Sequence, residues 1–343
     1  MNAREDKIRL MFVGDINLGE YYTSFGHGPK TFIKTQSPFS KVNELFQNAD
    51  FVIGNLEAAL TDVNLCPEEP ESVVLRGSPR DAHILTSANF RVLQVANNHT
   101  VQHGDEGFEE TVSVLKANGI EPVGLNGQSV HVIEVKGRRI GFLSASDVPD
   151  NTNKCQIKYQ KLDDHFLNRV KNSVAKVDHL FVLLHWGLES STEKMAYQVS
   201  MSSMLKKLGV RGVIGQHPHL FYEVTCDDDF VFAPSLGNFV FDLAWDKRLL
   251  KTGILDLVIS DDKVHAWIWP VSIRQNGCLP SVSSERVAVK TKLKLYELGS
   301  SMTGEQARKI KYFIMNIFKG DTRLKLKFFL RKIFPVFKKT PTS

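Results

Sequence analysis

Several features that would assign a chain to a special structural class are missing from this sequence. Its 343 residues contain four cysteines, and no two of them form a C-x-x-C pair, so neither a disulfide framework nor a thiolate metal site is predicted. No run approaches 18 apolar residues, and we expect no transmembrane helix. The charged start, from Met1 to Lys7, has no apolar segment of the signal-peptide kind. These absences predict a cytoplasmic protein, which its C-terminal tail could still hold peripherally at the inner face of the cell membrane.

Charge is distributed unevenly along the chain. The net charge is +5, yet residues 303–343 carry eleven Lys and Arg against two acidic residues. That segment is therefore +9, and the remaining 302 residues sum to −4. Composition predicts a mildly acidic body and a basic tail, in a chain whose 42% hydrophobic residues suffice for a sizeable core.

Hydrophobic periodicity predicts helices packed outside sheets. Four stretches place apolar residues at helical spacing, namely 40–48, 106–118, 163–176 and 192–208. The segments 131–135 and 139–144 predict a hairpin. Further strands are expected over 230–234, 253–259 and 263–271. The fold class is therefore α/β, with residues 68–79 as an excursion over the surface.

The last part of the chain, residues 299–343, predicts a basic amphipathic tail of two helices, attached to one globular unit over residues 1–298. Thr303 to Gln306 resembles a capping box that opens the first helix. The apolar face of this helix comprises Ala307, Ile310, Phe313, Ile314 and Ile317. The second helix aligns Leu326, Phe329, Leu330, Ile333 and Phe337.

A basic tail with an apolar face has three candidate binding surfaces: the globular body, an anionic membrane and nucleic acid. Contacts with a phosphate backbone do not need large apolar side chains, so nucleic acid is the least favoured partner. Packing on the body and contact with a membrane surface remain as alternatives.

The most informative pattern is a series of polar groups that each follow a short apolar run directly. These groups are Asp15, Glu57, Asn98 with His99, His185, and His217 with His219. Strand ends can meet at one edge of a sheet, where these carboxylate, amide and imidazole groups would converge. Hard or borderline divalent ions bind this mixture of ligands. In an extended segment, His217 and His219 would also project to the same side.

Each of these residues, taken alone, has an ordinary structural explanation. Asp15 could form a turn, Glu57 could start a helix, and His185 could be a core histidine at a strand end. The joint pattern is hard to attribute to chance and predicts a centre for two divalent ions, for which Mn²⁺, Fe and Zn²⁺ are all suitable. Two ions about 3.5–4 Å apart can acidify a bridging water to hydroxide and neutralise charge on a phosphoryl or carboxyl oxygen.

Seven short motifs occur between Arg9 and Asp242. They are Val13-Gly14-Asp15, Gly54-Asn55-Leu56-Glu57, Leu75-Arg76-Gly77-Ser78-Pro79, Ala96-Asn97-Asn98-His99, Leu184-His185-Trp186-Gly187, Ile214-Gly215-Gln216-His217-Pro218-His219 and Ser235-Leu236-Gly237-Asn238-Phe239. As a set they resemble the CapA family, the poly-γ-glutamate capsule synthesis proteins of the calcineurin-like metallophosphoesterase superfamily. The resemblance implies a four-layer αββα sandwich with a dinuclear site at the sheet edges, followed here by a C-terminal helical appendage.

The resemblance also implies roles for individual residues. Glu57 takes the place of the carboxylate that bridges the two ions, and His99 that of the catalytic histidine that meets the leaving group. The remaining ligands divide into Asp15 and His219 for one ion, and Asn98, His185 and His217 for the other. Two positions depart from the family pattern, because Gln102 stands where Asp is common and Gln216 where His is common.

Five more residues of these motifs are expected behind the ligands or at the substrate: Asn55, Asn97, Arg76, Trp186 and Asn238. Trp186 either packs under the site or stacks on substrate. Arg76 either binds an anionic group or is an ordinary exposed loop residue. Asn238 either orients a ligand or tightens a turn.

Three functions are compatible with these residues. The first is a metal-dependent hydrolase that acts on a phosphoester, or on an amide or ester of a cell-envelope polymer. The second is a non-catalytic component of a membrane-associated capsule or exopolysaccharide assembly system, in which the metal site binds an anionic polymer. The third is a nuclease, which the acidic body disfavours. The complete ligand set favours the hydrolase, whereas the tail and the link to envelope polymers favour the assembly component.

Overall fold

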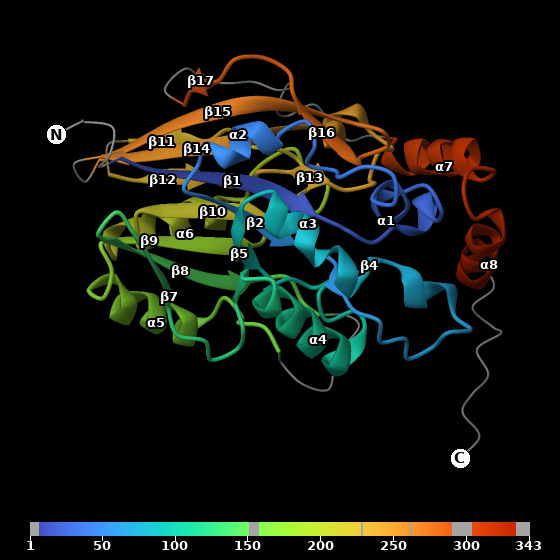
Figure 1. Cartoon of the computed structure of the whole chain (residues 1–343), viewed down its shortest axis with the longest axis horizontal. Coiled ribbons are helices and arrows are strands. Elements are labelled where there is room, and N and C mark those ends of the chain that lie inside the picture. Colours follow the sequence, from blue (N-terminus) through green and yellow to red (C-terminus); the bar gives the residue numbers. More distant parts are fainter. Residues whose placement is uncertain (1–6, 151–157, 228, 261–262, 290–303, 334–343) are drawn as a thin grey trace.

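The computed structural model describes residues 7–150, 158–227, 229–260, 263–289 and 304–333. Two β-sheets lie face to face, and helices cover their outer faces (Figure 1). The strand order of the first sheet is β16-β15-β14-β1-β2-β5-β6, and that of the second is β11-β12-β10-β9-β8-β7.

The first sheet combines a parallel half with an antiparallel half. Its parallel strands are β1 (Ile8–Ile16), β2 (Phe51–Leu56), β5 (Phe90–Gln94) and β6 (Glu121–Val123). Its antiparallel strands are β14 (Lys251–Ser260), β15 (Lys263–Arg274) and β16 (Leu279–Val282). Two short strands join the sides of this path, β13 (Asn238–Val240) beside β1 and β17 (Val287–Ala288) beside β15.

The second sheet is mostly parallel. Its strands are β7 (His131–Val135), β8 (Arg138–Ser146), β9 (His179–His185), β10 (Gly212–Gln216), β11 (Thr225–Cys226) and β12 (Val231–Ala233). The antiparallel pair β7 and β8 is the predicted hairpin, closed by a two-residue turn at Lys136 and Gly137 that both have positive φ. A separate parallel pair consists of β3 (Ala59–Leu60) and β4 (Arg76–Gly77).

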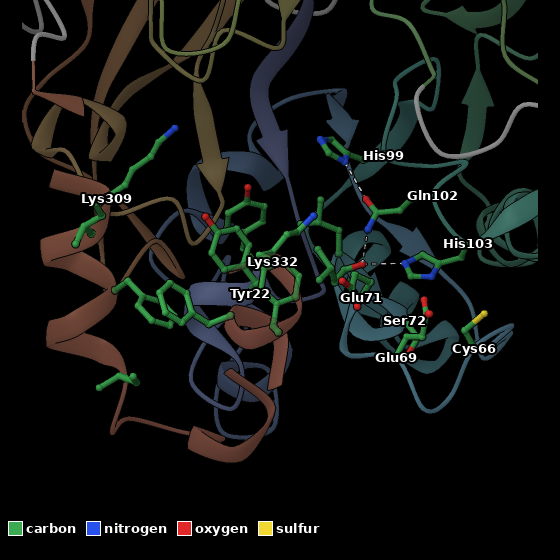
Figure 2. A pocket seen from close by; sticks show the side chains of 18 of the residues that line it. Tyr22, Cys66, Glu69, Glu71, Ser72, His99, Gln102, His103, Lys309 and Lys332 are labelled. Carbon is green, nitrogen blue, oxygen red and sulfur yellow. Dashed lines mark hydrogen bonds between the residues drawn. The ribbon is translucent and has the colours of Figure 1, made fainter. Parts of the chain in front are cut away.

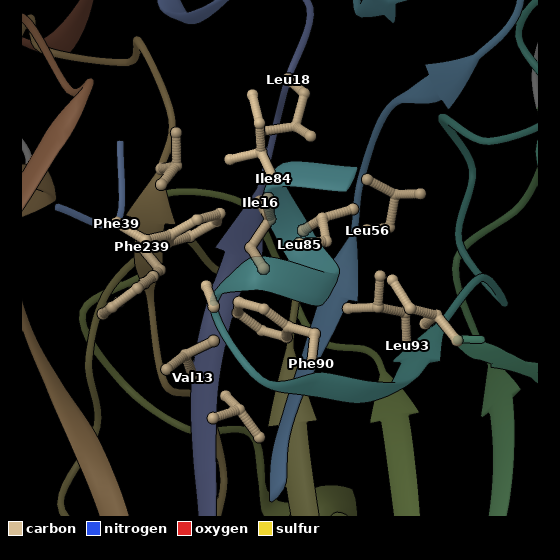
Figure 3. Packing of buried hydrophobic residues seen from close by; sticks show 14 of the residues in the cluster. Val13, Ile16, Leu18, Phe39, Leu56, Ile84, Leu85, Phe90, Leu93 and Phe239 are labelled. Atoms are coloured by element: carbon tan, nitrogen blue, oxygen red, sulfur yellow. The ribbon is translucent and has the colours of Figure 1, made fainter. Parts of the chain in front are cut away.

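Alternation along the strands creates the layers. On β1, Leu10 and Phe12 point into the space between the sheets, where Phe12 meets Phe181 with ring centroids 5.5 Å apart. Met11 and Val13 point to the outer face, into the core that Figure 3 shows beneath the helices. The sandwich is therefore the expected four-layer αββα arrangement.

The four helices predicted for the body lie close to their predicted positions, and two further short helices, α1 (Pro29–Phe32) and α3 (Ala82–Ser87), were not predicted. On the outer face of the first sheet are α2 (Asn43–Gln47), α3 (Ala82–Ser87) and α4 (Gly104–Ala117). The outer face of the second sheet carries α5 (Asp164–Val174) and α6 (Ala196–Lys207). The short helix α1 (Pro29–Phe32) lies at one end of the sheets. The helix predicted over 192–208 starts late, because Met195 still has extended backbone angles and the helix begins at Ala196.

The segment 68–79 was predicted as a surface excursion, and this prediction was wrong. Its Leu75 is fully buried, and Gly77 pairs with Leu60 in the small parallel sheet. Side-chain burial thus ties this segment to the body. Its first part is the 3₁₀ turn Pro70–Val73, which contacts the helix over residues 322–333.

The described part of the tail forms α7 (Glu305–Asn316) and α8 (Thr322–Ile333), which pack on the body (Figure 1). The Phe328 ring stacks on Tyr22 with centroids 4.5 Å apart. Leu326, Phe329 and Leu330, predicted for the apolar face of the second helix, are exposed, whereas Lys325 and Phe328 are buried against the body. Thr303, Phe337 and the predicted boundary at 298/299 lie outside the described residues. Among the described residues, no helix combines the length and the apolarity needed to cross a membrane.

Candidate metal centre

The carboxyl ends of the central strands of both sheets deliver the predicted residues to one place. On β1, Asp15 stands opposite Asn55 of β2 on one side and Asn238 of β13 on the other. In the second sheet, His185 ends β9 opposite Gln216, the last residue of β10. Parallel strands end at the same edge, so the polar residues that follow them meet there.

Close backbone approach is needed where these strands end. A Cβ on Gly14 would lie 1.8 Å from the carbonyl oxygen of Gly237. Any residue other than glycine at position 14 would therefore push β1 away from the turn that precedes β13, and Asp15 and Asn238 would separate.

The segment from His217 to His219 is not extended, contrary to the prediction. Both histidines have positive φ, 97° and 60°, a region in which a bulky residue costs about 1–3 kcal/mol. Both imidazoles nevertheless face the centre, and their ring centroids are 6.3 Å apart. Strain of this kind is retained where the surrounding structure holds the side chains in place, which is typical of binding and catalytic sites.

Glu57 lies between two groups of ligand atoms. One group contains Glu57, His185 and His217, the other Asp15, Glu57 and His219, and the ligand atoms of each group lie within 4.8 Å of one another. The Glu57 Oε1 atom is 3.9 Å from His185 Nε2 and 3.7 Å from His219 Nε2. A carboxylate shared by two groups lies where a ligand that bridges two ions would lie.

The amide of Asn98 joins the His185 group. Its Oδ1 lies 3.1 Å from His185 Nε2, and its Nδ2 lies 3.2 Å from His99 Nε2. The His99 ring is also near the shared carboxylate, at 3.8 Å from Glu57 Oε1. In the tautomer that donates from Nδ1 to Gln102 Oε1, 3.0 Å away, its Nε2 faces the centre.

A chain of amides positions the two carboxylates. Asn55 Nδ2 donates to Asp15 Oδ1 at 2.8 Å and to Glu57 Oε2 at 3.1 Å. Asn97 Nδ2 in turn donates to Asn55 Oδ1 at 3.0 Å and to the carbonyl of Leu56 at 2.8 Å. These bonds use one oxygen of each carboxylate and leave Asp15 Oδ2 and Glu57 Oε1 without a hydrogen-bond partner among the described residues.

Asn238 holds the ring of His219. The His219 Nδ1 atom lies 2.9 Å from Asn238 Oδ1, while Asn238 Nδ2 donates to the carbonyl of Leu249 at 3.2 Å. A histidine that donates from Nδ1 to an amide oxygen presents Nε2 as the free ligand atom. The same Nδ1 is 3.2 Å from Asp15 Oδ2. The shorter contact, to Asn238, has hydrogen-bond geometry. The contact to Asp15 does not, so Asp15 Oδ2 has no hydrogen-bond partner among the described residues.

The electrostatics of the centre are those of a cation site. Burial and then the nearby Asp15 carboxylate raise the pKa of Glu57 well above its ordinary value. Burial lowers the pKa of His217 to about 4 and that of His185 well below its ordinary value, so both rings are neutral at physiological pH. Burial also lowers the pKa of His219, but its contact with Asp15 outweighs this and the net shift is upward. Metal ions bind neutral imidazole and ionised carboxylate, and their charge would compensate the buried carboxylates.

The unpartnered ligand atoms show that divalent ions fit these residues. Asp15, Glu57, His185, His217 and His219 are all buried. Buried polar atoms normally have partners, yet Asp15 Oδ2, Glu57 Oε1 and His217 Nδ1 have none among the described residues. All three belong to the two groups of ligands, and bound cations would satisfy them.

Two residues of the sequence prediction do not face the cavities at this centre. The Arg76 guanidinium donates to the carbonyl of Val63 at 2.9 Å, and Arg76 does not line the cavities beside His99. Trp186 is fully buried and donates to the carbonyl of Pro234 at 3.0 Å, so it packs under the site and does not face substrate.

Sequence reasoning missed Glu189. This exposed carboxylate lines a cavity of about 60 Å³ together with His99 and His219. Partial burial raises the pKa of Glu189, but the imidazoles, His219 first, outweigh this effect and lower it. Its place two residues after Gly187, in the loop that follows His185, was the signal that could have found it.

Known proteins share this sequence pattern. A model of the family described as bacterial capsule synthesis protein PGA_cap matches residues 9–243. The chain belongs to this family. The match covers the whole centre from Asp15 to His219 and ends before the tail helices.

Two similar proteins come from bacilli. The PGA biosynthesis protein CapA of Bacillus subtilis (strain 168) is 24% identical over 253 residues, which are 71% of this chain and 66% of that protein. The capsule biosynthesis protein CapA of Bacillus anthracis is 25% identical over 283 residues, 75% of this chain and 68% of that protein. The chain spans about two thirds of the length of these relatives. Among solved structures, 5′-nucleotidase from Candida albicans SC5314 has a TM-score of 0.45 at 12% identity, covering 75% of this chain and 48% of that one.

Proposed function

We propose that this PGA_cap family member is a metal-dependent hydrolase that cleaves a phosphoester during the production of a capsule-type polymer. The observation that carries the proposal is Glu57 Oε1, buried and unpartnered, at 3.7–3.9 Å from the Nε2 atoms of His219 and His185. Asp15 and His219 would hold one ion, and Asn98, His185 and His217 the other. Two Mn²⁺, Fe or Zn²⁺ ions bound there would supply Lewis acidity and a water that is nucleophilic near neutral pH.

The residues of the chain have separate tasks in this reaction. Hydrolysis adds the oxygen of water to phosphorus and breaks the bond from phosphorus to the ester oxygen. His99 lies beside the ligands and opens onto the cavities, so it is placed to give a proton to the departing oxygen. Burial lowers the pKa of the free imidazole, and the negative charge of a phosphoester next to it would favour the protonated ring.

The non-catalytic alternative is supported by the basic tail helices, which lie beside the centre in the same structure. In that case the ions would bind an anionic polymer and no bond would be broken. The two functions differ in one measurable property, which is turnover.

The experiment compares wild-type protein with His99→Ala and His217→Ala in hydrolysis of bis(4-nitrophenyl) phosphate and 4-nitrophenyl phosphate with added Mn²⁺. We expect a loss of about 10²–10⁴-fold in His99→Ala, because proton transfer by a positioned side chain contributes that much. His217→Ala should lose at least as much, because it lacks a ligand of an ion that activates the water. His99→Ala should keep its metal, whereas His217→Ala should lose it. Activity unchanged in both variants would reject the proposed centre. Stoichiometric metal without turnover in the wild type would assign the protein to the binding alternative.

A further inference from the structure

A large cavity connects the tail helices with the metal centre. Its volume is about 1220 Å³, above the roughly 300–1,000 Å³ of ordinary small-molecule sites. In Figure 2, α7 and α8 with Lys309 and Lys332 form one wall, and the segment that carries Cys66, Glu69 and Glu71 forms the other. His99 lies at one end of this cavity.

Large apolar side chains dominate both walls. Leu65, Val74 and Leu75 contribute from the body, and Ile310, Phe313 and Ile314 from α7. Ile310 and Ile314 remain 59% and 61% exposed although they belong to a helix that packs on the body. Apolar side chains that face each other across an open space favour an apolar ligand between them.

The charges of the cavity favour an anionic group near the centre. The acidic side chains on the body wall, Glu69 and Glu71, are paired with Arg331 at 2.6 Å and 3.6 Å. Lys309 and Lys332 of the tail also line the cavity, and Lys309 is paired with Glu305 of its own helix. Lys309 also lines the smaller cavity beside His219, so the tail places a cation next to the metal centre.

The large cavity adjoins the smaller one at the centre. Tyr21, Tyr22, His99 and Lys309 line both, and the smaller one also contains His219. A ligand whose phosphorus lies at the ions could therefore extend past His99 into the apolar space. Its polar and apolar parts would each meet matching residues.

We propose that the substrate is a phosphoester of a long-chain alcohol and that the hydrocarbon chain occupies the groove between α7, α8 and residues 65–75. This inference rests on the proposed function, because it takes the metal centre as the site of the phosphoryl group. Since His99 lies where the groove begins, the long-chain alcohol is the leaving group. Water adds to phosphorus, the bond to the alkyl oxygen breaks, and that oxygen takes a proton from His99.

The first experiment measures binding rather than turnover. Non-hydrolysable n-alkyl phosphonates with chains of 4, 8 and 12 carbons are titrated below their micelle concentrations into the metal-loaded, full-length protein. Each methylene that enters the groove should raise the affinity roughly fourfold, from the free energy of burying one CH₂. Ile310→Gln and Ile314→Gln should weaken binding of the 12-carbon chain at least tenfold and leave the 4-carbon chain unchanged.

Met315→Gln is the matched control. Met315 is exposed on the same helix but does not line the cavity, so this variant should bind all three chains like the wild type. Affinity independent of chain length in the wild type would overturn the proposal. Binding that appears only in a chain ending at residue 333 would assign the groove to residues 334–343, and dimerisation abolished by Ile314→Gln would assign it to a second copy of the chain.

Turnover separates this inference from the proposed function. Hydrolysis of bis(4-nitrophenyl) phosphate without any chain-length effect in binding would support the proposed hydrolase and reject the groove as a site for a hydrocarbon chain. A chain-length effect without hydrolysis of any ester would support the groove and reject the hydrolase. If the protein shows both hydrolysis and a chain-length effect in binding, long-chain esters should have a lower KM than short-chain esters. Ile314→Gln should remove that difference.

Discussion

At the scale of single residues, Glu57 is the side chain on which the centre depends. Glu57→Gln keeps the volume and the hydrogen bond from Asn55 but removes the charge that two ions would share. We expect the loss of at least one ion of the pair, measured as metal content per chain. A full complement of two ions in the variant would contradict a bridging role. Glu189→Gln, at an exposed carboxylate beside the centre, should keep both ions.

Glu57→Gln should also stabilise the metal-free protein. Because the folded-state pKa of Glu57 is raised, folding binds a proton there, and the metal-free wild type loses stability as pH rises above the unfolded value of about 4.5. At pH 8 the metal-free Glu57→Gln protein should therefore melt at least about 2 °C higher, a shift equivalent to roughly 1 kcal/mol in a large domain. Calorimetry of both metal-free proteins measures this, and a lower melting temperature in the variant would contradict it.

Asn238 sets the orientation of a ligand. Asn238→Ala removes the oxygen 2.9 Å from His219 Nδ1, so the ring should lose its fixed tautomer and position. Loss of such a supporting group costs about 10–100-fold in metal affinity, which competition with a chelator measures. Asn238→Asp, which keeps an acceptor oxygen, should restore most of the affinity, whereas equal affinity in all three proteins would show that the contact has no effect on the ion.

The sequence contained enough to predict which residues meet. Asp15, Glu57 and His185 end apolar runs, and strands of that kind bring their ends to one edge. Which nitrogen of each ring faces the centre could not be predicted, because it depends on contacts such as Asn238 to His219 between distant segments. For the same reason, the hydrogen bond from Arg76 to the carbonyl of Val63 could not be predicted, although Arg76 lies in one of the motifs.

At the scale of elements, Lys325 holds α8 against the end of α7. Its buried Nζ donates to the carbonyls of Asn316, at 2.8 Å, and Lys319, at 2.6 Å. Lys325→Met leaves both carbonyls without this donor, which should cost about 1–3 kcal/mol. Urea unfolding and limited proteolysis of the tail measure the loss, with the exposed Lys311→Met as the control that should behave like the wild type. Unchanged protease resistance in Lys325→Met would contradict this anchoring role.

The same lysine gives this prediction a pH signature. Burial lowers the pKa of Lys325 to about 8 from an ordinary 10.5. Between these values the unfolded chain binds more protons, so the stability of the wild type should rise with pH over that interval. In Lys325→Met the rise should be smaller.

Periodicity could not predict how α8 is rotated about its own axis, and therefore which of its faces packs on the body. Leucine and phenylalanine at 326, 329 and 330 form an apolar stripe, yet the helix turns Lys325 and Phe328 to the body. The turn before the helix fixes this rotation, because Asp321 N donates to the carbonyl of Phe25 at 2.8 Å. A Cβ on Gly320, which has φ 63°, would lie 2.3 Å from that same carbonyl oxygen. A tertiary contact thus overrode the amphipathic pattern.

At the scale of the whole molecule, the tail presents an apolar and basic surface. Phe318 and Met315 are 86% and 65% exposed, and residues 304–333 carry nine Lys and Arg against two acidic residues. We propose that this surface touches an anionic membrane, where each basic residue contributes about 1 kcal/mol. Cosedimentation with phosphatidylglycerol vesicles should weaken at least tenfold in Phe318→Glu. Val132→Glu, on the distant strand β7, should bind like the wild type, and equal binding of both variants would reject the contact.

The affinity of the protein for metal ions should depend on pH. The raised pKa values of His219 and Glu57 mean that the metal-free centre holds protons which an ion must displace, whereas His217, with a pKa of about 4, is already neutral. Mn²⁺ affinity should therefore increase from pH 6 to pH 8, and binding of the ion should release protons. Calorimetric titration in two buffers of different ionisation enthalpy counts these protons. The same affinity at both pH values would show that the cluster of Asp15, Glu57 and His219 does not hold the ion.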